Sequence, residues 1–262
     1  MANRKEIETG MKYFVDEHSI VRKIWGKADT VLFIFAGAAA EFALNKAVDW
    51  LYFTGKLPAD PLGRLFSTVT YAHKILFSTY DDANAAIDQI TAIHKQVETA
   101  RGSQIPDWAY RDVLFMLIDY SIRSYELLER KLTTVEKSEI FNVFYNVGAR
   151  MGLKDLPIGY QAWVTMRSEH LQQNMEYSGL TRNLFKQYRK HLGSPRYWLL
   201  KKVQALVVPA RVKQLLRLKD GNILRPILFI YKLTGVINLQ HILRDTLLPQ
   251  KYKAQIQALD SE

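Results

Sequence analysis

The chain has 262 residues, of which 48% are hydrophobic and 24% charged, proportions that exclude a wholly disordered protein. It contains no cysteine, which excludes a disulfide scaffold, a cysteine zinc site, an iron–sulfur cluster and a thiol nucleophile. The net charge is +10, and the excess lies in residues 151–262, which hold 18 Lys/Arg against 7 Asp/Glu.

Apolar residues recur at helical spacing along the chain and hairpin signals are nearly absent, so the sequence predicts an all-α protein. We expect helices over residues 31–51 (one or two), 61–77, 81–100, 107–132, 133–152, 160–175 and 181–191, then a basic helical stretch from 194 with a break at Pro209, and two or three more helices. The simplest organisation is a single domain over 1–262, and the charge shift permits a basic C-terminal subdomain over 181–262.

Polar residues mark where several of these helices begin. Asp60 precedes a proline, and we expect it to cap the helix that follows. The aspartates at 81–82 and Asp107 are the expected caps of the next two helices. Thr133 and Glu136 have the spacing of a capping box, which predicts another helix start.

The N-terminus and the apolar runs predict where the protein resides. Residues 1–10 mix acidic and basic side chains without an apolar stretch, so no signal peptide is expected. No apolar run reaches the ~20 residues that a spanning helix needs. We therefore expect a cytoplasmic protein without a transmembrane segment, associated with a membrane only peripherally if at all.

Common catalytic motifs are absent: GxGxxG, the P-loop, GxSxG, HExxH and Glu-x-x-His, so hydrolase or non-haem metal chemistry is not expected. Two histidines, His73 and His94, lie on apolar helical faces. Such a histidine is either a satisfied core residue or the axial ligand of a flat apolar cofactor such as haem. Spacing alone favours the core residue for both.

Arg64 and Thr68 are four residues apart and therefore share one face of a helix. A partly buried arginine needs an anion. That anion is either Asp49 or Asp60, in a structural salt bridge, or the carboxylate of a ligand such as a haem propionate. Spacing alone favours the salt bridge.

Several segments occur in an order that is similar to that of one known family. In this chain they are DPLGRLFST, then YAHKILFSTYDDA, ITAIHKQV and, further on, LVVPARVKQLL. Over about residues 24–249 the chain resembles the catalytic domain of MpaB-type oxygenases and rubber oxygenases (latex clearing proteins). The resemblance implies an all-helical fold around one haem b. It also implies that His94 is the axial ligand of the haem iron and that Arg64 and Thr68 line the haem pocket. His73 has no matching role.

The chain also departs from the rubber-cleaving members of that family. They carry a lysine immediately before the threonine, where this chain has Ser67. They also use a carboxylate base from the preceding helix, for which Glu41 and Asp49 are the candidates here. We therefore expect a haem-dependent oxygenase that uses O₂ on a small apolar, unsaturated substrate, lipid-like or isoprenoid-like. The alternative is a non-catalytic helical protein that binds haem, a membrane or a partner.

The stretch Arg189–Lys219 is basic and interleaved with apolar and aromatic residues, including Tyr197 and Trp198. Such a helix can lie on an anionic membrane surface. An ordinary solvated helix packed on the domain is at least as good an interpretation. Nucleic-acid binding is not expected, because the chain has no zinc-finger or RNP-type signature.

Overall fold

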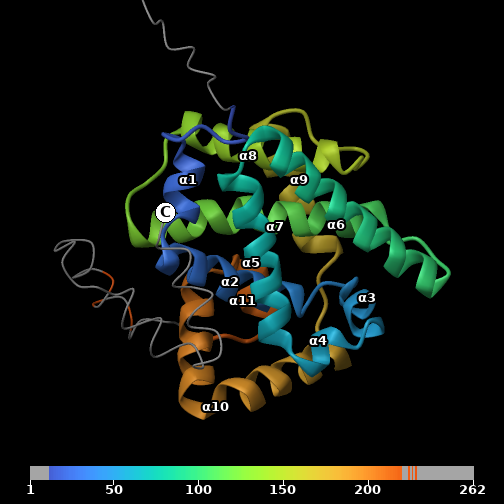
Figure 1. The fold of residues 1–262 in the computed structure, drawn as a ribbon. Coiled ribbons are helices and arrows are strands. Elements are labelled where there is room, and N and C mark those ends of the chain that lie inside the picture. Colours follow the sequence, from blue (N-terminus) through green and yellow to red (C-terminus); the bar gives the residue numbers. More distant parts are fainter. Residues whose placement is uncertain (1–11, 220–223, 225, 227, 229–262) are drawn as a thin grey trace, which may run out of the picture.

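The computed structural model describes residues 12–219 together with residues 224, 226 and 228 (Figure 1). This part of the chain is built from α-helices without a strand, which confirms the predicted all-α class. The helices are α1 (Ile20–Trp25), α2 (Ala28–Phe42), α3 (Val48–Phe53), α4 (Lys56–Ala59), α5 (Pro61–Phe77), α6 (Tyr80–Arg101), α7 (Asp107–Leu128), α8 (Thr134–Arg150), α9 (Tyr160–Gln173), α10 (Gly179–Val207) and α11 (Ala210–Leu215).

The centre of the fold is the pair α2 and α7, which pack on each other more extensively than any other two described helices. Almost every side chain of α2 is buried, because α2 is apolar all round rather than along one stripe. The two helices approach closely at Gly37, where an added Cβ would lie 2.3 Å from the ring of Tyr120. A residue without a side chain is therefore required at this crossing.

The other helices surround this pair, as the ribbon shows (Figure 1). The consecutive helices α5 and α6 pack on each other, and α10 packs on α2 and also contacts α5. On the other side, α8 and α9 both contact α7. None of the helices in the described ranges is long and apolar enough to cross a membrane.

The local start signals are partly confirmed. Helix α5 spans the predicted 61–77, and the Asp60 carboxylate accepts a hydrogen bond from the backbone N–H of Gly63 at 2.9 Å. The capping box of Thr133 and Glu136 is present at the start of α8. Two predicted caps are wrong: Thr79 caps α6, and Asp107 is already the first residue of α7. Residues 81–82 lie inside the first turn of α6, where backbone angles are helical and a cap cannot form.

The basic C-terminal region is helical as the pattern predicts, and the two predicted segments on either side of Gly193 form one bent helix. Helix α10 bends at Gly193, whose φ of 74° and ψ of 165° are not helical, and then continues to Val207. The predicted break at Pro209 is confirmed, since Pro209 separates α10 from α11. The helices expected beyond α11 lie outside the described residues, and the domain division stays a prediction.

Candidate functional site

Arg64 and Thr68 lie one turn apart on α5, as their spacing predicts. The Arg64 guanidinium donates to the hydroxyl oxygens of Ser67 at 3.0 Å and Thr68 at 3.1 Å. Both hydroxyls are themselves within hydrogen-bonding distance of the Arg64 carbonyl. The partners of this half-buried guanidinium are neutral, and burial lowers the pKa of Arg64 from its ordinary value. An arginine nevertheless remains charged at neutral pH.

The carboxylates that could have paired with Arg64 have other roles. Asp49 forms an ion pair with Arg101 at 2.7 Å, and Asp60 caps α5. The ion pairs found within residues 12–219 include none from Arg64. In the described structure Arg64 is thus a cation without a carboxylate.

His94 lies on α6, and its imidazole faces Tyr110 of α7, with the ring centroids 5.2 Å apart. Its Nδ1 atom is buried and has no hydrogen-bond partner. Burial first, and then the positive charge of Arg64, lower the pKa of His94 to about 4, against the opposing charge of Glu98. The imidazole is therefore neutral at pH 7, which is the form that coordinates iron.

Tyr110 is a neighbour of His94 that the sequence pattern did not reveal. Its hydroxyl donates to the Glu98 carboxylate at 3.1 Å, and the same carboxylate oxygen accepts the backbone N–H of Ile105 at 2.9 Å. Burial and the charge of Glu98 raise the pKa of the Tyr110 hydroxyl, which therefore stays protonated. These contacts hold the start of α7 against the end of α6 and the Tyr110 ring against His94.

His73 is separate from this arrangement. Its ring stacks on Phe77 of the same helix, with centroids 4.1 Å apart and an interplanar angle of 16°. Nine residues along α5 from Arg64, it lies about 180° around the helix. The structure therefore gives His73 an aromatic contact and does not bring it together with Arg64 and His94.

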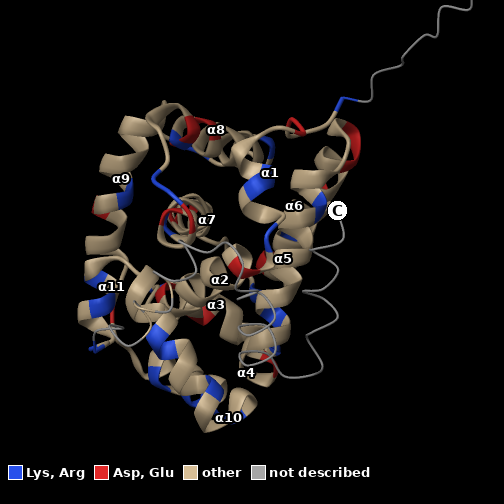
Figure 2. Ribbon diagram, turned by 90° about the vertical axis from the view of Figure 1, so that its left-hand side faces the viewer, with Lys and Arg blue, Asp and Glu red and all other residues tan. Residues whose placement is uncertain are grey.

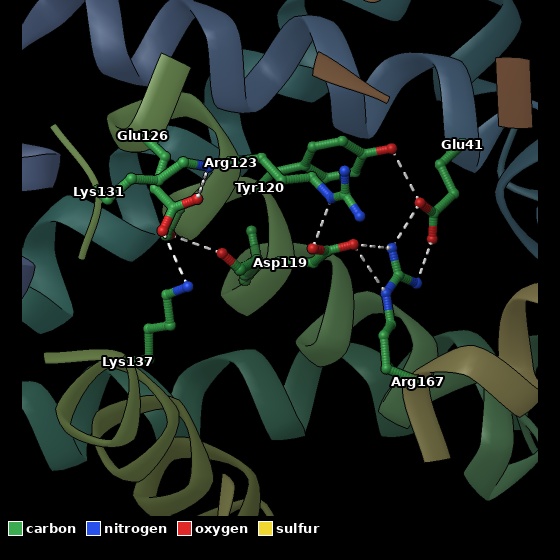
Figure 3. Close-up of polar contacts among 10 residues, drawn as sticks. Glu41, Asp119, Tyr120, Arg123, Glu126, Lys131, Lys137 and Arg167 are labelled. Atoms are coloured by element: carbon green, nitrogen blue, oxygen red, sulfur yellow. Dashed lines mark hydrogen bonds and ion pairs between the residues drawn. The ribbon is translucent and has the colours of Figure 1, made fainter. Parts of the chain in front are cut away.

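Glu41, one of the two candidate bases, lies in a buried ionic network (Figure 3). The Arg167 guanidinium of α9 donates to both of its carboxylate oxygens, at 2.6 and 2.7 Å, and the Tyr120 hydroxyl of α7 donates at 2.9 Å. Arg167 also binds Asp119 of α7, at 3.0 Å. The network thus joins α2, α7 and α9 through charges that the sequence pattern did not connect.

The electrostatics of this network explain why it stays charged and bonded. Burial disfavours the charged form of Arg167, but the Glu41 and Asp119 carboxylates outweigh burial and raise the pKa of the guanidinium. Burial and the charge of Glu41 raise the pKa of Tyr120, so its hydroxyl remains a donor. Because both oxygens of Glu41 are engaged, the carboxylate would have to give up a strong bond to act as a base. Its catalytic role, like that of Asp49, stays a prediction.

A second buried carboxylate, Asp112, connects α7 to the end of α2 and to α9. It bonds the Nδ1 of His170 and accepts from the amides of Asn45 at 2.8 Å and Asn174 at 3.0 Å. His170 is buried, whereas Glu169, its neighbour in sequence, is exposed. These two potential metal ligands therefore do not face the same site. Within the described ranges no group of three or more His, Cys, Asp or Glu side chains could hold a metal ion.

An apolar pocket of about 60 Å³ lies between α2, α5 and α10, on a different face of α5 from Arg64. Its lining is apolar apart from one tyrosine: Leu32, Phe35, Ala36, Ala39, Leu62, Leu65, Phe66, Tyr188, Leu192 and Leu200. The pocket is smaller than the roughly 300–1,000 Å³ of most ligand sites. It does not include His94.

The arrangement of His94, Arg64 and Thr68 can be compared with known proteins. A family model described as "ER-bound oxygenase mpaB/B'/Rubber oxygenase, catalytic domain" matches residues 16–234. The match covers most of the chain and contains the three residues just named, and it starts and ends somewhat earlier than the resemblance read from the sequence. No curated protein matches the chain.

Proposed function

The chain belongs to the family of ER-bound oxygenase mpaB/B' and rubber oxygenase catalytic domains, and we propose that it is a haem-b-dependent oxygenase that uses O₂ on a small apolar, unsaturated substrate. One observation carries the proposal. His94 presents a neutral imidazole with a buried, unpartnered nitrogen, close enough to Arg64 for that charge to lower its pKa. An iron ligand and a counter-charge for a carboxylate are the two features that a haem requires from the protein.

The residues present fit that cofactor chemically. When bound, the haem supplies the oxygen chemistry, and the protein supplies ligation, orientation and access. With a pKa of about 4, His94 stays unprotonated and able to act as a ligand throughout the neutral range. Tyr110 contacts the imidazole ring and limits its rotation, since the Tyr110 hydroxyl is itself held by Glu98.

Arg64 is the residue we assign to a haem propionate. Its guanidinium is oriented by the hydroxyls of Ser67 and Thr68 rather than neutralised by a carboxylate. Charge-assisted bonds from an arginine to a carboxylate are about twice as strong as bonds between neutral groups. A propionate can therefore displace the weaker contact with Ser67, while Thr68 continues to accept from the guanidinium and to orient it.

The apolar pocket supports the substrate class. Its walls from α2, α5 and α10 offer methyl, methylene and aromatic groups and no charge, so they would bind hydrocarbon and exclude water. The presence of Ser67 in place of the lysine of rubber-cleaving relatives favours a small substrate over polyisoprene.

The first test is the absorbance spectrum of the purified protein after haem reconstitution, with pyridine haemochrome analysis of the haem type. We expect a Soret band and one haem b per chain. His94→Ala should abolish or greatly weaken the band, whereas His73→Ala, the control on the other face of α5, should keep it. A wild-type spectrum in His94→Ala would show that the axial assignment is wrong.

The second test measures haem affinity in variants of α5. Arg64→Ala should lower it by about 3–5 kcal/mol, because a buried propionate would lose its counter-charge. Thr68→Val should cost about 1–3 kcal/mol, since it leaves one partner unsatisfied. Unchanged haem affinity in Arg64→Ala would contradict the propionate assignment.

The third test concerns the substrate. The protein is incubated with latex, and the products are analysed for fragments that end in aldehyde and ketone groups. We expect no such fragments from the haem-loaded protein. Clear fragment release would refute the preference for a small substrate without affecting the haem assignment.

A further inference from the structure

The longest described helix, α10, belongs to a segment without a single acidic residue. Between Glu176 and Asp220 the sequence contains 11 Lys/Arg and no Asp or Glu. In Figure 2, α10 lies along the lower edge of the molecule and carries blue segments and no red ones. The other two described helices of more than 20 residues, α6 and α7, both contain acidic residues. The basic side chains of α10 are thus not balanced within their own helix.

Before the bend, the basic side chains of α10 lie on one exposed face. The exposed positions are Arg182, Lys186, Arg189 and Lys190, whose spacing of three and four places them on one side of the helix. Leu184, Tyr188 and Leu192 on the opposite side are buried. None of the four cations takes part in an ion pair found within residues 12–219. The basic face therefore begins earlier than the stretch identified from the sequence.

After the bend at Gly193, the outward side combines aromatic and basic groups. Trp198 is 50% exposed, and the Nζ of Lys202 lies 5.6 Å from the centroid of its ring. The Nζ of Lys201 lies 6.0 Å from the ring of Tyr197. Tryptophan and tyrosine with neighbouring lysines are typical of helices that lie at a membrane–water interface.

We propose that the outer face of α10 docks on an anionic lipid bilayer. We call this surface the α10 basic face; it has two parts, Arg182, Lys186, Arg189 and Lys190 before the bend and Trp198, Lys201 and Lys202 after it. The proposal concerns location and does not depend on the haem assignment.

Two observations favour a bilayer over another polyanion. An exposed tryptophan gains from insertion among lipid headgroups. On the inner side of the same helix, Leu192 and Leu200 on either side of the bend line the apolar pocket. A docked α10 would thus place an apolar site next to a source of apolar molecules.

Vesicle binding tests the proposal on the full chain. The protein is sedimented with phosphatidylcholine vesicles and with vesicles that also contain phosphatidylserine, at low and high salt. We expect binding only to the anionic vesicles and a marked loss at high salt, because the attraction is screened. No binding to anionic vesicles at low salt would overturn the proposal, as would tight binding to RNA without binding to vesicles.

A charge-reversal variant shows which surface is responsible. Lys186→Glu/Arg189→Glu/Lys190→Glu should weaken partitioning by at least about 100-fold, since each basic residue near the surface contributes a factor of about 5. Circular dichroism confirms that the variant is folded.

The matched control changes the same net charge elsewhere, through the exposed lysines of Lys23→Glu/Lys74→Glu/Lys154→Glu. It should retain most of the binding. An equal loss in both variants would show that net charge alone attracts the protein and would overturn the assignment to α10.

Insertion of the aromatic side chain is measured separately. Vesicles with brominated acyl chains quench tryptophans that reach the lipid. We expect quenching in the wild type and its loss in Trp198→Phe, which leaves the other four tryptophans in place. Quenching that persists unchanged in Trp198→Phe would contradict the docked orientation.

Discussion

Replacing Arg167 by methionine tests whether the buried network of Glu41, Asp119 and Arg167 holds the fold together. The side chain of Arg167 is 5% exposed and that of Glu41 is fully buried, at an N–O distance of 2.6 Å. Arg167→Met keeps much of the volume but leaves two carboxylates without their buried cation. Removing one partner of a buried pair costs about 3–5 kcal/mol. That is a large share of the roughly 5–15 kcal/mol by which domains are stable.

The measurement is the free energy of unfolding from urea denaturation followed by circular dichroism. Arg123→Met is the matched control, because Arg123 binds the same Asp119 at 2.7 Å but its side chain is 41% exposed. Because the Arg123 side chain is solvated, we expect its pair to contribute only about 0.2–1 kcal/mol. In the double variant Glu41→Gln/Arg167→Met, part of the loss should be recovered, because one unpaired charge is gone. The reasoning is refuted if Arg167→Met costs no more than Arg123→Met.

Three further predictions address single positions. The pKa of His94 falls from an ordinary 6.5 to about 4 on folding. The free energy of unfolding should therefore be highest above pH 6.5 and should fall by at most about 3 kcal/mol as the pH is lowered toward 4. This part of the pH dependence of unfolding should be absent in His94→Phe. Gly37→Ala should lower the free energy of unfolding by about 1–3 kcal/mol, because the added Cβ displaces the Tyr120 ring. Gly179→Ala is the control and should have little effect on the urea midpoint, because an added Cβ there meets nothing within 4 Å. Thr133→Ala should lower the free energy of unfolding by about 1 kcal/mol through loss of the capping box of α8, and an unchanged midpoint would show that the cap is not needed.

Local structure could be predicted from the sequence because it depends on residues close together in the chain. Asp60 begins α5, and Thr133 with Glu136 begins α8, through hydrogen bonds that span three residues. Gly193 bends α10 because glycine adopts a positive φ without steric cost. The two wrong caps, at 81–82 and Asp107, show the limit of such signals, since neighbouring polar residues compete for one cap position.

The family could also be predicted from the sequence, because it is identified by the order of short segments around Arg64, Thr68 and His94 along the chain. The helical class follows from hydrophobic spacing for the same reason. The environment of His94 could not be predicted in this way. Its contact with Tyr110 comes from another helix, and no periodicity within α6 predicts it.

The tertiary structure alone decided which charges are paired. Glu41 and Arg167 are 126 residues apart, and each lies in a helix whose own pattern shows no partner for it. Likewise, the sequence allows Asp49 as the partner of Arg64, but the tertiary structure pairs Asp49 with Arg101. The physical reason is that burial and Coulomb energy depend on distances in space, which the packing of α2, α5, α7 and α9 sets and which no short stretch of sequence encodes.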